Sequence, residues 1–134
     1  MELRSVEELM DLLYVCRGQC GALRTAALLR RSRPADKELQ VAGLVHSIGP
    51  LLGPGDQARH AHRAADAVRP LLGGRVARLV RDHSAPGPAD DDLLRLRHAV
   101  EEARTAAFDA GVLEDWRTVL ELVAGRNSRL ESVD

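Results

Sequence analysis

The side chains with the clearest chemical potential in this sequence are its five histidines, His46, His60, His62, His83 and His98. An imidazole can take up or release a proton near pH 7 and can bind a metal ion. His46, His60 and His83 stand beside apolar residues on predicted helices, whereas arginines flank His62 and His98. The first three are therefore candidates for chemistry, and the last two are expected on the surface. The competing interpretation is that His46 and His83 are hydrogen-bonded core residues packed against one another.

Helices are the elements that must position these side chains. Apolar residues recur at spacings of three and four, no stretch alternates with period two, and no Asn-Gly or Asp-Gly turn joins two apolar runs. The sequence therefore predicts an all-α fold, a compact bundle of six to seven helices. The predicted helices cover residues 5–14, 23–29, 34–46, 56–72, 75–83, 90–108 and 113–124.

Polar caps and breakers set the limits of these helices. Ser5 and Glu8 form a capping-box pattern, and aspartates stand at the predicted starts near residues 36, 56 and 90. Segment 48–55 holds three glycines and two prolines and is predicted to be a loop. Helix 34–46 is the most apolar and should be the most buried, while helix 90–108 should be the longest. Gly125 is expected to cap the last helix before a polar tail that frays.

Composition excludes several classes of protein. The 134 residues fit one domain, 1–134, with a core at about 5–125. The net charge of -1 and the 2% of aromatic residues argue against nucleic acid as a partner. No apolar run approaches the roughly 20 residues of a membrane span, and no signal peptide is visible, so we expect no membrane partner and a cytoplasmic location. Cys16 and Cys20, four residues apart, are interpreted as buried free thiols.

Residues 41–49, Val-Ala-Gly-Leu-Val-His-Ser-Ile-Gly, resemble the signature of the HD-domain superfamily, in which an apolar helix delivers a His-Asp pair before an Ile-Gly turn. His60 and His83 resemble the next two histidines of that superfamily. Residues 22–27 are similar to the helix that carries the first ligand histidine in the branch of phosphonate-cleaving and inositol-cleaving diiron oxygenases. Residues 94–103 are similar to the closing helix, which gives the last aspartate ligand. The resemblance implies an HD-domain-like bundle built around a two-metal site.

The same resemblance, which covers about residues 8–124, predicts that the two-metal site is incomplete. Ser47 stands in the place of the aspartate of the pair, Gly21 in that of the first histidine, and Val100 in that of the last aspartate. A hydroxyl cannot bridge two cations as a carboxylate does, and glycine and valine offer no donor. We therefore expect no cofactor, or at most one divalent ion of Fe, Mn or Zn.

Three histidines and two arginines make up the candidate site. His46, His60 and His83 are the candidate ligands of such a single ion, and His46 and His83 are the candidate catalytic residues through acid-base chemistry. Arg63 and Arg81 lie on the helices that line the pocket mouth in the family, and arginine suits phosphate or carboxylate ligands. The alternative is that these arginines coat the solvent face of the bundle.

The lost ligands favour a pseudoenzyme that binds a small anionic molecule or a protein partner. The first alternative is an active enzyme of bacterial specialised metabolism, either a phosphohydrolase-like or oxygenase-like metalloenzyme or a metal-free acid-base enzyme. The second alternative is a helical interaction module that forms a homodimer through its first or last helix. A bacterial source is inferred because almost all of the basic residues are arginines, and Lys37 is the only lysine.

Overall fold

The computed structural model describes residues 2–16 and 21–131, and these fold entirely into helices and connections. No strand occurs in those two ranges, so the all-α prediction is confirmed. The elements are α1 (Val6–Cys16), α2 (Ala22–Ser32), α3 (Lys37–Val45), α4 (Gly49–Leu52), α5 (Gln57–Leu72), α6 (Gly74–Asp82), α7 (Asp91–Thr105), the 3-10 helix η1 (Leu113–Trp116) and α8 (Arg117–Glu131). None of the described helices is both long and apolar enough to cross a membrane.

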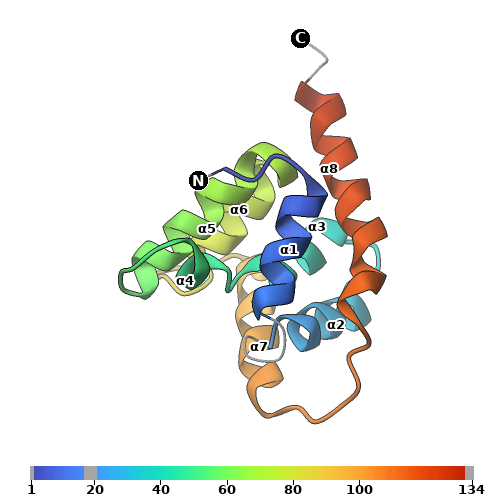
Figure 1. The fold of residues 1–134 in the computed structure, drawn as a ribbon. Coiled ribbons are helices and arrows are strands. Elements are labelled where there is room, and N and C mark those ends of the chain that lie inside the picture. Colours follow the sequence, from blue (N-terminus) through green and yellow to red (C-terminus); the bar gives the residue numbers. More distant parts are fainter. Residues whose placement is uncertain (1, 17–20, 132–134) are drawn as a thin grey trace.

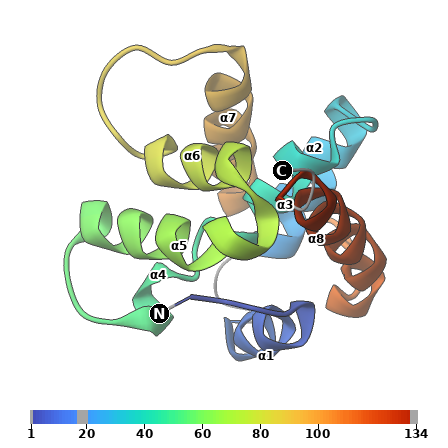
Figure 2. The ribbon, with the colours of Figure 1, turned by 90° about the horizontal axis from the view of Figure 1, so that it is seen from above.

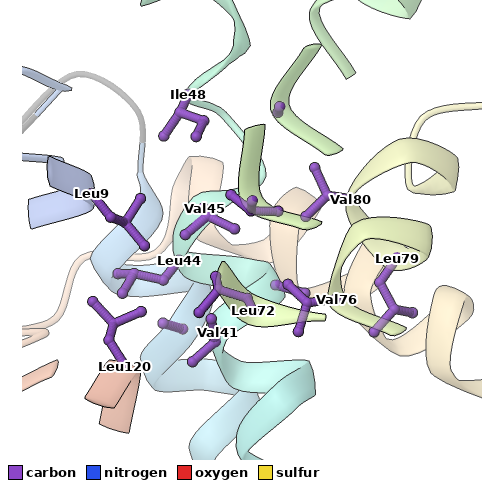
Figure 3. Packing of buried hydrophobic residues seen from close by; sticks show 14 of the residues in the cluster. Leu9, Val41, Leu44, Val45, Ile48, Leu72, Val76, Leu79, Val80 and Leu120 are labelled. Atoms are coloured by element: carbon purple, nitrogen blue, oxygen red, sulfur yellow. The ribbon is translucent and has the colours of Figure 1, made fainter. Parts of the chain in front are cut away.

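Helix α3 occupies the middle of the bundle, where it contacts α2, α6, α7 and α8 (Figures 1 and 2). Every residue from 39 to 45 is buried, which confirms that this helix is deeply enclosed. The α3 side chains pack among residues of four other helices in Figure 3: Leu9 of α1, Leu72 of α5, Val76 of α6 and Leu120 of α8. Burial of this apolar surface is the main term that stabilises the fold.

The predicted polar caps begin the helices as expected. Asp36, Asp56 and Asp90 each accept a hydrogen bond from the backbone N–H three residues further on, at 3.1, 3.0 and 2.9 Å. Ser5 Oγ accepts from the N–H of Glu8 at 3.2 Å, and Glu8 Oε1 accepts at 2.8 Å from the N–H just before Ser5. Each cap satisfies a donor that the first helical turn leaves without a partner.

Segment 48–55 is not wholly a loop, because Gly49–Leu52 form the single turn α4. Pro50 fits there because the first turn of a helix does not need its N–H. Gly49 lies so close to α5 that an added Cβ would clash with the backbone of His60. The glycine that suggested a break therefore serves as a close contact between two helices.

Helix α7 ends at Thr105 rather than near Phe108, and its 15 residues make it one shorter than α5. In its last turn the carbonyl of Ala103 accepts a hydrogen bond from Arg24 Nε at 3.0 Å. Phe108 instead lies under the guanidinium of Arg31, 4.6 Å from its ring centre. Side chains of α2 thus hold the end of α7 and the chain that follows it.

Helix α8 continues through Gly125 to Glu131, so Gly125 is not a C-cap and residues 125–131 form no frayed tail. Asn127 Nδ2 donates to the carbonyl of Pro70 at 3.0 Å, which ties this extension to the end of α5. Residues 132–134 and Cys20 lie outside the described residues, as does the side chain of Cys16.

Candidate functional site

His46 and His83 occupy equivalent places, each directly after the last residue of a helix, α3 and α6 respectively. Each Nδ1 lies 2.6 Å from the carbonyl oxygen three residues back, that of Gly43 for His46 and that of Val80 for His83. A carbonyl only accepts, so Nδ1 carries the proton in both neutral rings. The Nε2 atom of each ring then holds a lone pair that can accept a proton or a hydrogen bond.

The two rings meet edge to face, with centroids 5.2 Å apart and planes at 80°. The interpretation that His46 and His83 pack against one another is therefore confirmed. The pKa of His46 is lowered to about 4, chiefly by burial and also by the nearby His83 and Arg104, although its bond to Gly43 acts in the opposite direction. Burial is also the main cause that lowers the pKa of His83. Both imidazoles are consequently neutral near pH 7.

A cavity of about 360 Å³ lies beside His46, between the start of α2, the end of α3 and the last turns of α7. We call it the His46 cavity. Its described wall residues are Gly21, Arg24, Thr25, His46, Val100, Ala103 and Arg104. The volume is at the lower end of the range for small-molecule pockets.

Gly21 and Val100 line the His46 cavity together with His46 itself. These are two of the three positions at which the HD-domain resemblance places the missing ligands; the third, Ser47, is not among the described wall residues. Three segments that lie far apart in the sequence thus meet around one small space.

The charged residues of this wall, Arg24 and Arg104, were not predicted. Each stands three or four residues after a position that the resemblance had singled out, Gly21 for Arg24 and Val100 for Arg104. Residues at those spacings share one face of a helix, and this was the signal that could have identified them.

The described wall of the His46 cavity has positive groups and no carboxylate. Arg24 forms no ion pair within the described part of the chain, and its Nε bonds only to the carbonyl of Ala103. Arg104 Nε lies 3.7 Å from Glu101 Oε2, a contact between two largely exposed side chains that water screens. The cavity is therefore an electropositive space without an internal counter-ion.

The predicted substrate-binding residues Arg63 and Arg81 lie elsewhere. Arg81 holds the carboxylate of its neighbour Asp82 with two bonds of 2.9 and 3.2 Å. Arg63 donates from Nη1 to the carbonyl of Pro54, in the connection between α4 and α5. Neither side chain lines the His46 cavity.

The predicted metal ligands are only partly brought together. His60 is half-buried on α5, and no group of three or more His, Cys, Asp or Glu side chains among residues 2–16 and 21–131 is arranged to hold a metal ion. Ser47 Oγ is buried and has no hydrogen-bond partner in those ranges. With a hydroxyl at Ser47 and no donor at Gly21 or Val100, the residues present do not fit a two-metal centre.

No protein-family model matches this chain, and no curated protein was found to be similar to it. The function of the His46 cavity must therefore be inferred from its own side chains.

Proposed function

We propose that this chain is an HD-domain-like protein that binds a small anionic molecule in the His46 cavity without a two-metal centre. The observation that carries the proposal is the described wall of that cavity, which holds Arg24 and Arg104 and no carboxylate, Arg104 having only a long, exposed contact with Glu101 outside the wall. Guanidinium groups suit phosphate and carboxylate oxygens because their N–H donors match the spacing of these acceptors. The meeting of Gly21, His46 and Val100 around one cavity supports the HD-domain-like part of the proposal.

The neutral imidazole of His46 offers this positive site one further hydrogen-bond acceptor. Its Nδ1 proton is held by the carbonyl of Gly43, so Nε2 remains as an acceptor. Arg24 keeps the N–H donors of its two terminal nitrogens, since only Nε is used by Ala103. An oxyanion that keeps one O–H, such as hydrogen phosphate, could receive bonds from Arg24 and donate one to His46.

Titration calorimetry with inorganic phosphate tests this proposal. We expect saturable binding to the unaltered protein and at least about tenfold weaker binding to the Arg24→Gln variant, the loss of one charge-assisted contact. Arg126→Gln is the matched control, because Arg126 is exposed on α8 and lies outside the cavity. Absence of binding, or equal weakening by both substitutions, would contradict the proposal.

Metal analysis separates this proposal from an active metalloenzyme. The protein is purified without chelator, loaded anaerobically with iron, manganese and zinc, and measured by elemental mass spectrometry. We expect far less than one ion per chain, because the two-metal donor set is incomplete. Near one ion per chain that is lost in His60→Ala or His83→Ala would favour the enzyme and overturn the proposed role.

A further inference from the structure

A second cavity shares part of its wall with the His46 cavity. It measures about 250 Å³ and is lined by residues of α1, the start of α2, α3 and the chain after α7. Five large apolar side chains line it: Leu13, Leu23, Leu44, Phe108 and Leu113. We call this space the leucine cavity.

Gly21 and Arg24 belong to the described walls of both cavities. Gly21 has no side chain to separate them, and its φ of +66° suits glycine. A Cβ built on Gly21 would lie 3.9 Å from Arg24 Nη2, so the guanidinium stands close to this shared wall. One positive group is thus placed at the border between a polar and an apolar space.

Asp109 is the one carboxylate among the described wall residues of the leucine cavity. It is exposed, and its Oδ1 accepts a hydrogen bond from the N–H of Gly111 at 2.9 Å. This local bond stabilises the turn that follows α7. The carboxylate of Asp109 is therefore hydrogen-bonded to the loop backbone, and it forms no ion pair with Arg24 among the described residues.

We infer that the two cavities together bind one amphipathic anion, a medium-chain aliphatic carboxylate whose head lies at Arg24 and whose chain fills the leucine cavity. This inference rests on the proposed function and names its class of ligand. Water occupies roughly 30 Å³ per molecule in the liquid, and a methylene group is of similar size, so the leucine cavity has room for roughly eight such groups. Burial of each methylene should strengthen binding by about fourfold.

A series of straight-chain carboxylates tests the inference by calorimetry. We expect the dissociation constant to fall about fourfold per methylene from acetate through hexanoate, and to level off near octanoate or decanoate. Arg24→Gln should weaken every member of the series by a similar factor, since it removes the contact with the head. A flat series, or octanoate binding that Arg24→Gln leaves unchanged, would overturn the inference.

A substitution that fills the leucine cavity gives an independent test. Ala110 lines this cavity and not the His46 cavity, whereas Ala107 is exposed in the same connection and lines neither. Ala110→Phe should weaken octanoate binding at least about tenfold and leave acetate and phosphate binding unchanged, and Ala107→Phe should change none of them. Thermal unfolding checks that both variants fold. If Ala110→Phe does not fold, the chain-length series decides.

Failure of the inference can be told from failure of the proposed function. If phosphate binds through Arg24 but chain length has no effect, the amphipathic ligand is wrong while the anion site stands. If neither phosphate nor any carboxylate binds, both are wrong.

Discussion

The arginines near the two ends of α3 differ in the carboxylate partners that the protein gives them. At its start, Arg75 of α6 meets Asp36 at 2.7 and 2.8 Å, Glu38 at 3.1 Å and Asp92 of α7 at 3.0 Å. At its end, His46 adjoins a cavity whose arginines meet no carboxylate in the described wall. One end balances its charges within the protein, whereas at the other end Arg24 forms no ion pair among the described residues.

The difference shows which arginines are structural. Arg75 is the first cause that holds the pKa of Asp36 below its usual value, and it does so against the opposing effect of burial. Arg78 and Arg81 are also paired, with Asp90 at 3.2 Å and Asp82 at 2.9 Å. The arginines of α6 therefore mainly join helices, whereas Arg24 of α2 forms no ion pair among the described residues.

Removing Arg75, the cation shared by the carboxylates at the start of α3, should have the largest effect on stability. Arg75→Ala leaves Asp36, Glu38 and Asp92 without their shared cation, and their side chains are less than a third exposed. We expect a loss of about 2 to 3 kcal/mol in unfolding free energy, between the values for exposed and buried pairs. Urea unfolding measures it, and phosphate binding to the folded variant should be unchanged. A loss below about 1 kcal/mol would mean that the cluster is not structural.

Acidification should lower the stability of the protein through the buried imidazole of His46, which follows the last residue of α3. The pKa of His46 is about 4 in the folded protein against 6.5 when unfolded, so the unfolded chain gains a proton first as the pH falls. Stability should therefore drop by about 2 kcal/mol between pH 7 and pH 5, before most carboxylates titrate.

The slope of stability against pH is the readout for His46. His46→Gln should remove most of that slope, leaving the smaller share that His83 contributes. His98→Gln is the control, because His98 is exposed on α7. An unchanged slope in His46→Gln would show that His46 is not the group responsible.

Arg24→Gln should separate binding from stability. It removes one hydrogen bond to the carbonyl of Ala103 and no ion pair within the described residues, so we expect a loss below about 1 kcal/mol. Binding of phosphate should nevertheless weaken at least about tenfold. Urea unfolding and calorimetry on the same sample measure stability and binding. A loss of stability as large as that of Arg75→Ala would show that Arg24, like Arg75, has a structural role.

Arg78→Gln should have the smallest effect. Its partner Asp90 is about half exposed, and such pairs contribute little in water. We expect a change below about 0.5 kcal/mol in urea unfolding. A larger change would place Arg78 with Arg75 in the structural cluster.

The candidate site was only partly predictable from the sequence. The contact between His46 and His83 was one of two interpretations left open by their apolar neighbours on predicted helices, and the surface positions of His62 and His98 followed from their arginine neighbours. The cavity arginines were not foreseen, because a count of arginines cannot tell a paired guanidinium from an unpaired one. That distinction depends on which carboxylates other helices bring near.

Local chemistry in the sequence determined the helical class, the aspartate caps and the burial of α3. These features depend on residues within one or two turns of each other, so short-range pattern suffices. Only the tertiary structure decided that Gly49 begins a helical turn against His60, that α7 stops where Arg24 bonds to Ala103, and that α8 continues past Gly125 to Asn127. Each of these rests on a contact between distant segments, and such contacts leave no periodic trace in the sequence.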